Sequence, residues 1–96
     1  MIKHLVLFRF REEAGSAAID AIVAGLEGLP ALIADIRSLE VGRDILRTER
    51  SYDLALISDF ADLAALERYQ VHPEHQKVVA LVKQAASSVV AVDYEY

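Results

Sequence analysis

The sequence predicts an α+β domain in which helices cover one face of a four-stranded antiparallel sheet. Segments with a period of two, typical of strands, alternate with segments in which apolar residues recur every three or four positions, typical of helices. Their order along the chain is strand, helix, strand, strand, helix, strand. The chain has 96 residues, enough for one hydrophobic core, so residues 1–96 are expected to form a single domain.

The first strand is predicted at residues 2–11. One of its faces is apolar except for a single histidine, and consists of Ile2, His4, Val6, Phe8 and Phe10. The other face has charged residues at its ends and Leu5 and Leu7 in its middle. Apolar residues on both faces are typical of a sheet that is covered on both sides.

The first helix is predicted to begin after Ser16, a favourable N-cap residue. Apolar residues then recur at helical spacing, namely Ile19, Ile22, Val23, Leu26 and Leu29. Gly28 is expected to cap the C-terminus of this helix, and Pro30 to start a short second helical turn. The apolar stripe is expected to pack on the first strand.

The second and third strands are predicted at residues 36–44 and 52–60, joined by a polar hairpin loop at 47–51. Alternation in the second strand places Leu39 and Val41 on one side and Ile36 on the other. The third strand again has apolar residues on both faces, Leu54, Leu56 and Phe60 on one and Ala55 and Ile57 on the other. Burial on both faces is therefore expected for a second strand of the sheet.

The second helical region is predicted to begin after Asp62 as its N-cap and to break at Pro73. Proline lacks a backbone N–H and restricts the residue before it, so the helix has to end or turn there. Proline is favourable in the first turn of a new helix. Before the break the expected buried residues are Leu63, Leu66 and Tyr69 or Gln70, and after it His75, Val78, Val79, Leu81, Val82 and Ala85.

The last strand is predicted at residues 87–96, where Val90, Val92 and Tyr94 alternate with Val89, Ala91 and Asp93. The complete order is the ferredoxin-like arrangement, with helices on one face of the sheet. The open face is expected to carry apolar residues drawn from Leu5, Leu7, Ala55, Ile57, Val89 and Ala91. Such a face is best buried against an identical sheet, which predicts a homodimer whose two sheets form a barrel.

The composition is consistent with burial against a second chain and disfavours several classes of function. Hydrophobic residues make up 54% of the chain, and the mean hydropathy is +0.26, both high for a small domain. The net charge of −5, with interspersed charges, argues against nucleic-acid binding. There are no cysteines for disulfide or thiolate chemistry and no glycine-rich phosphate loop. No signal segment or membrane span is present, so we expect a cytoplasmic protein that does not contact membranes.

The candidate functional site is the segment 69–75, which contains a tyrosine and two of the three histidines. Histidine is the side chain whose ordinary pKa lies near neutrality. The predicted faces direct His4 and His75 into the space between sheet and helices, with Tyr69 closing it. A neutral imidazole there could remove a proton alpha to a carbonyl while the tyrosine hydroxyl stabilises the oxyanion, each contributing roughly 100-fold to 10,000-fold. This chemistry needs no cofactor.

The same residues have a purely structural alternative. In that interpretation, His75 and Tyr69 form hydrogen bonds with backbone carbonyls where Pro73 breaks the helix. His72, which directly precedes the proline, is expected to act as an extended junction residue or helix cap. A metal site made of the three histidines is disfavoured because no paired carboxylate lies at a recognised spacing.

Three stretches of the chain resemble the stress-responsive dimeric α/β-barrel (Dabb) family. They are residues 2–10 (IKHLVLFRF), residues 42–44 with 51–56 (GRD and SYDLAL), and residues 69–75 (YQVHPEH). The resemblance implies a ferredoxin-like protomer in a homodimer. The family includes a plant polyketide cyclase in which a tyrosine and the second histidine of the last motif are associated with aldol-type ring closure. By matching positions, the resemblance implies Tyr69, His75 and His4 as the corresponding site residues here.

Three functions remain open from the sequence. The first is a small-molecule pocket that binds an apolar carbonyl compound and catalyses proton transfer or aldol-type cyclisation. The second is a non-enzymatic stress or assembly protein whose function is the homodimer itself. The third, from analogy of fold, is a cofactor-independent oxygenase.

Overall fold

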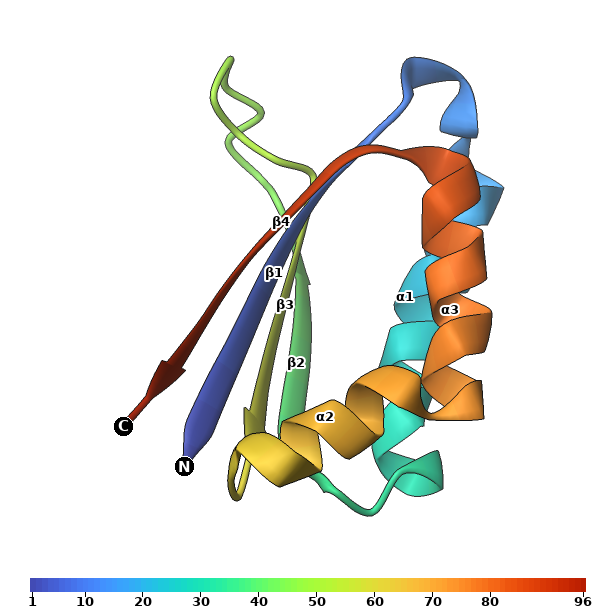
Figure 1. The fold of residues 1–96 in the computed structure, drawn as a ribbon. Coiled ribbons are helices and arrows are strands. Elements are labelled where there is room, and N and C mark those ends of the chain that lie inside the picture. The colour runs from blue at the N-terminus through green and yellow to red at the C-terminus, as the bar shows by residue number, and fades with distance from the viewer.

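The computed structural model describes all 96 residues as two layers, with the helices on one face of a single sheet (Figure 1). The elements in chain order are β1 (Ile2–Phe10), a 3₁₀ turn (Glu12–Ala14), α1 (Ser16–Leu32), β2 (Ile36–Arg43), β3 (Leu54–Phe60), α2 (Leu63–Val71), α3 (Pro73–Ala85) and β4 (Ala86–Glu95). The strands are ordered β2-β3-β1-β4, and all neighbours are antiparallel. The predicted α+β, ferredoxin-like class is therefore confirmed. None of the helices is long and apolar enough to cross a membrane.

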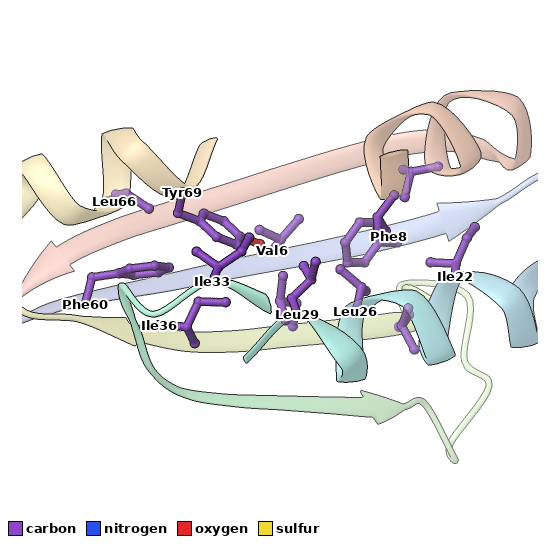
Figure 2. Packing of buried hydrophobic residues seen from close by; sticks show 14 of the residues in the cluster. Val6, Phe8, Ile22, Leu26, Leu29, Ile33, Ile36, Phe60, Leu66 and Tyr69 are labelled. Atoms are coloured by element: carbon purple, nitrogen blue, oxygen red, sulfur yellow. The ribbon is translucent and has the colours of Figure 1, made fainter. Parts of the chain in front are cut away.

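The core lies between the sheet and the three helices (Figure 2). Phe8 and Val6 of β1 face Leu26 of α1, and Phe60 of β3 packs near Tyr69 of α2 (Figure 2). The predicted alternation of β1 is confirmed, because Ile2, Val6, Phe8 and Phe10 are all buried together with His4. Each fully buried large aliphatic side chain stabilises the fold by roughly 1.5–3 kcal/mol relative to exposure.

A register shift in β2 makes one face assignment wrong. Ile36 pairs with Phe60, whereas Ser38 already pairs with Asp59, so one extra residue is accommodated between them. The shift brings Ile36, which is buried, to the same side as Leu39 and Val41. The prediction placed it opposite those residues because simple alternation takes no account of a bulge.

The face assignment of β4 is also wrong. Val89 pairs with Phe8 and Ala91 with Val6, so both lie on the side covered by helices. The open face instead carries Val90, Val92 and Tyr94, which are 44%, 62% and 46% exposed. Alternation separates the two sets correctly, but both are apolar, so only pairing with β1 decides which set faces the helices.

The ends of α1 differ from the prediction as well. The helix continues through Gly28 and Pro30 to Leu32, and it is Ile33 whose backbone N–H bonds to the Leu29 carbonyl at 2.9 Å. Leu29 and Ile33 are each 1% exposed on either side of the proline, so packing of the last turn outweighs the hydrogen bond that Pro30 removes. At the other end no side chain caps the helix. Gly15, with φ of 79°, occupies the N-cap position, and Ser16 is already helical.

The helix break at Pro73 is confirmed, with α2 ending at Val71 and α3 beginning at the proline. Asp62 is the N-cap of α2, where its carboxylate accepts the Ala65 N–H at 2.9 Å. The prediction that Leu63 and Leu81 are buried is wrong, because they are 58% and 40% exposed. The buried stripes consist of Ala65, Leu66 and Tyr69 in α2, and Val78, Val82 and Ala85 in α3.

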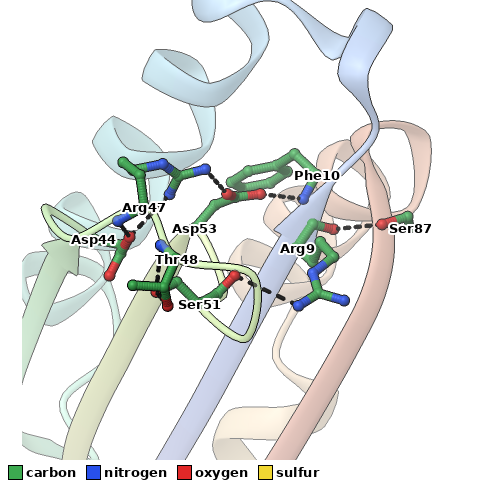
Figure 3. Close-up of polar contacts among 8 residues, drawn as sticks. All are labelled: Arg9, Phe10, Asp44, Arg47, Thr48, Ser51, Asp53 and Ser87. Atoms are coloured by element: carbon green, nitrogen blue, oxygen red, sulfur yellow. Dashed lines mark hydrogen bonds and ion pairs between the residues drawn. The ribbon is translucent and has the colours of Figure 1, made fainter.

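The long loop between β2 and β3 is fixed by polar contacts (Figure 3). The Arg47 guanidinium binds the carboxylates of Asp44 and Asp53. Asp53 also accepts the Phe10 backbone N–H at 2.7 Å, which ties the loop to the end of β1. Within the loop, Ile45 and Leu46 are 90% and 76% exposed. The loop is thus an ordered projection that presents apolar side chains to its surroundings.

Candidate functional site

A cavity of about 370 Å³ lies between α3 and the strands β1 and β4. Most of its lining is apolar and comes from β1, β3, β4, α1 and α3. Val89 and Ala91, which the sequence placed on the open sheet face, are part of this lining. The polar groups in it are His4, Gln70, His75 and Lys83. An apolar hollow with few polar groups is the usual form of a small-molecule site.

The helix break positions His75 at the cavity. His72 has extended backbone angles, φ −65° and ψ 134°, and its Nδ1 accepts the Glu74 N–H at 3.1 Å. It is therefore the N-cap of α3, as predicted, and it does not line the cavity. His75 follows in the first turn, with Nδ1 3.1 Å from the carbonyl oxygen of Gln70.

The hydrogen bond of His75 defines which of its nitrogens is free. A carbonyl oxygen can only accept, so Nδ1 carries the proton and, in the neutral ring, Nε2 keeps its lone pair. Burial lowers the pKa of His75 below its ordinary value of 6.5, although the bond to Gln70 opposes this shift. The ring is therefore neutral at pH 7 and is suited to accept a proton at Nε2. This contact with a backbone carbonyl is also what the structural alternative predicted for His75.

Tyr69 does not satisfy the structural alternative. Its side chain is 0% exposed, and its hydroxyl is the one buried side-chain polar atom without a hydrogen-bond partner. An unpaired buried polar group costs roughly 1–3 kcal/mol of stability, so the fold alone gives no reason to keep this hydroxyl. Burial raises the pKa of Tyr69 to about 12, which keeps the hydroxyl protonated and able to donate.

The three predicted site residues come together from β1, α2 and α3. The Tyr69 ring lies 6.1 Å from the His4 ring and 4.3 Å from the His75 ring, measured between centroids. Figure 2 shows Tyr69 pointing from α2 into the core. The two histidines line the cavity, whereas Tyr69 packs beneath them and does not itself line it. Tyr69 thus lies next to both histidines but does not close the cavity as the sequence analysis expected.

Sequence reasoning missed Asp93. This carboxylate lies opposite His4 in the pairing of β1 with β4 and forms a close hydrogen bond with its Nδ1. Because the carboxylate accepts, the bond orients the imidazole and leaves Nε2 of His4 without a protein partner. The available signal was that alternation places Asp93 on the same face of the last strand as Val89 and Ala91. That signal identifies a partner only once the strand register is known.

The arrangement is suited to acid–base chemistry on a small molecule. It combines a neutral imidazole, an unpaired tyrosine hydroxyl and a second imidazole held by a carboxylate. No group of three histidine, aspartate or glutamate residues lies close enough together to hold a metal ion.

Comparison with known proteins places the chain in a family. A Streptomyces coelicolor protein described as uncharacterised is 40% identical over the full length of both chains. A dimeric protein of unknown function from Bacteroides fragilis, with a ferredoxin-like fold, is 31% identical, with a TM-score of 0.89 over 99% of this chain and 95% of that one. A hydroxynitrile lyase from Passiflora edulis has the same fold at 18% identity, with a TM-score of 0.87 over 97% and 90% of the two chains.

The family model described as Stress responsive A/B Barrel Domain matches residues 2–96. The match therefore includes all four strands, all three helices and each of the site residues. The chain belongs to the stress-responsive A/B barrel domain family.

Proposed function

We propose that the protein binds an apolar carbonyl compound in the cavity between α3 and the sheet, and that it catalyses cofactor-free proton transfer on this compound. The observation that supports this function most strongly is the unpartnered, fully buried hydroxyl of Tyr69, whose ring lies close to the rings of both His4 and His75. A bound carbonyl oxygen would supply the missing acceptor. Catalytic hydrogen bonds commonly tighten only when the substrate is present, which accounts for a hydroxyl that lies just beneath the lining.

The proposed step begins at Nε2 of His75, which removes a proton from the carbon alpha to the carbonyl. The electrons of the C–H bond form the enolate, and the Tyr69 hydroxyl donates a hydrogen bond to its oxygen. In an aldol-type closure, the enolate carbon then attacks a second carbonyl of the same molecule. The new alkoxide takes the proton back from His75, so the enzyme returns to its starting state.

Asp93 and His4 have a supporting role in this proposal. The carboxylate holds the His4 ring so that Nε2 can bond to the ligand beside the reacting carbonyl. A hydroxynitrile lyase among the proteins of this fold supports the idea that the scaffold can hold an enzymatic site. The apolar lining favours a ligand with an alkyl or aryl body.

Deuterium exchange at the α-carbon of 2-decanone, followed by proton NMR in D₂O, tests the proposal. Wild type should accelerate exchange, and His75→Ala should lose roughly 100-fold to 10,000-fold of that acceleration. His72→Asn is the matched control, because asparagine retains the N-cap function and His72 does not line the cavity. Exchange equally fast in His75→Ala and wild type would rule out His75 as the base.

We also propose that the protein is a homodimer that buries the open sheet face. Leu7, Val90 and Val92 are 41%, 44% and 62% exposed on this face. Contiguous apolar surface of this kind is typical of an interface. The Bacteroides fragilis protein of the same fold is described as dimeric, which supports the assignment. A purely structural dimer is the second candidate function, and it predicts no exchange activity in any variant.

A further inference from the structure

Lys83 is a cation without a partner at the candidate site. The chain has three lysines, and the other two form ion pairs, Lys3 with Asp59 at 3.3 Å and Lys77 with Glu74 at 3.1 Å. Lys83 takes part in no hydrogen bond or ion pair, yet it lines the cavity. The lining contains no aspartate or glutamate. In a chain with a net charge of −5, this cavity therefore has a local positive charge that nothing in the lining neutralises.

The position of Lys83 relative to His75 divides the cavity into two ends. Both side chains line it from α3, eight residues apart on the same face of the helix. Eight residues correspond to about 12 Å along a helix axis. Between them the lining from α3 is apolar and consists of Val78, Val79 and Val82. The cavity thus has an imidazole at one end, an exposed ammonium group at the other and an apolar wall between them.

We propose that the ligand is an amphipathic oxo acid, with a carbonyl group at the histidine end and a carboxylate at Lys83. This inference rests on the proposed function and names the substrate class of the same site. An apolar chain between the two groups matches the valine wall, and the carboxylate stays partly hydrated at Lys83, which avoids the cost of burying an unpaired charge. The Lys83 ammonium group would favour carbonyl compounds that carry a carboxylate over those of the same length that do not, although the apolar wall binds both equally well.

Two ligands of equal length test the assignment. 9-Oxodecanoate and 2-decanone share the same methyl ketone and alkyl chain, and differ in that the first ends in a carboxylate. Calorimetric titration of wild type should give a dissociation constant about fivefold lower for 9-oxodecanoate, since a solvent-exposed ion pair is worth up to about a factor of five. The preference should fall as salt is raised, because exposed charges are screened.

Substitutions of Lys83 test whether this residue causes the preference for 9-oxodecanoate over 2-decanone. Lys83→Gln should bind both ligands equally, and Lys83→Glu should prefer the ketone. Lys77→Gln is the matched control, because Lys77 is an exposed lysine of the same helix that does not line the cavity, and it should retain the wild-type preference. A preference that persists in Lys83→Gln, or equal binding of the two ligands by wild type, overturns the proposal.

The two proposals fail in different ways. If wild type prefers 9-oxodecanoate through Lys83 but does not accelerate α-proton exchange, the proposal that Lys83 binds the ligand carboxylate is supported and the proposed catalytic function is wrong. If exchange depends on His75 while Lys83→Gln leaves the ligand preference unchanged, the proposed catalytic function is supported and the proposal that Lys83 binds the carboxylate is wrong. Absence of binding of either ligand by wild type overturns both.

Discussion

Tyr69 is the residue at which stability and the proposed function oppose each other. Its hydroxyl is buried without a partner, so Tyr69→Phe is expected to leave the free energy of unfolding unchanged or raise it by up to about 1 kcal/mol. The same change should slow α-proton exchange by about 100-fold, because the oxyanion loses its donor. Urea denaturation and the NMR exchange assay measure the two effects separately.

Tyr52 provides the matched control for this prediction. Its hydroxyl lies 2.9 Å from the Ser88 hydroxyl, so Tyr52→Phe breaks a formed hydrogen bond and should lower the free energy of unfolding by about 1 kcal/mol. Tyr52 does not line the cavity, and exchange should be unaffected. If Tyr69→Phe were the more destabilising of the two, the hydroxyl would have a structural partner after all.

The protonation of His75 is expected to determine how the rate of α-proton exchange depends on pH. Burial lowers the pKa of His75 from 6.5, so the folded state favours the neutral ring. The exchange rate should therefore fall on acidification with a midpoint below pH 6.5. This acidic decrease in rate should be absent in His75→Gln. The Tyr69 pKa of about 12 predicts no alkaline decline from this residue up to pH 11. A midpoint above 6.5 would contradict the assignment of His75 as the base.

The same shift predicts how stability responds to acid. Because the pKa of His75 is lower in the folded state, the unfolded state binds the proton first as the pH drops. The contribution of the neutral ring to stability is fully present above pH 6.5 and is lost as the pH falls from there through the lowered folded pKa. His75→Gln should show a smaller loss of stability over this range in urea titrations.

Among the elements, α3 depends on its cap. The His72 ring accepts the Glu74 N–H, so His72→Ala should lower the free energy of unfolding by about 1 kcal/mol, and His72→Asn should restore most of it. Neither variant should change the exchange rate per folded molecule, since the cap positions the helix and does not touch the ligand. A large loss of exchange in His72→Asn would show a direct role for this ring.

Element boundaries set by local chemistry could be predicted from the sequence. Asp62 as a cap, the break at Pro73 and the capping role of His72 each depend on residues within a few positions, and all three are confirmed. The predicted helix end at Gly28 was wrong because tertiary packing of Leu29 and Ile33 outweighs local preferences, and the predicted start was one residue late because Gly15, not Ser16, is the N-cap.

Features that depend on strand register could not be predicted. The pairing of His4 with Asp93 joins residues at opposite ends of the chain, and no local pattern specifies which residue of one strand faces which residue of the other. The placement of Val89 instead of Val90 on the side of the helices, and the shift that turns Ile36 inward, have the same cause. The candidate site was therefore predictable in its His4, Tyr69 and His75 members but not in its carboxylate.

At the scale of the whole molecule, the open sheet face is expected to determine assembly. Val92 is 62% exposed there, and Val92→Lys should convert a dimer to a monomer because a charge cannot be buried between two apolar sheets without a partner. Light scattering after size exclusion measures the mass. Leu32→Lys is the control, since Leu32 is 57% exposed on α1, away from this face. A wild-type protein that is monomeric at micromolar concentrations would exclude the homodimer.

The central position of β1 has a consequence for how the molecule is made. Within residues 1–96, β1 is the first strand and pairs with β4, the last, and the N and C ends drawn in Figure 1 lie near each other. Before β4 is in place, His4 lacks Asp93 and the cavity lacks the part of its wall formed by Val89 and Ala91. One edge of β1 thus stays unpaired until β4 joins the sheet, and pairing between strands so far apart in sequence is expected to make folding slower than in a protein of local contacts.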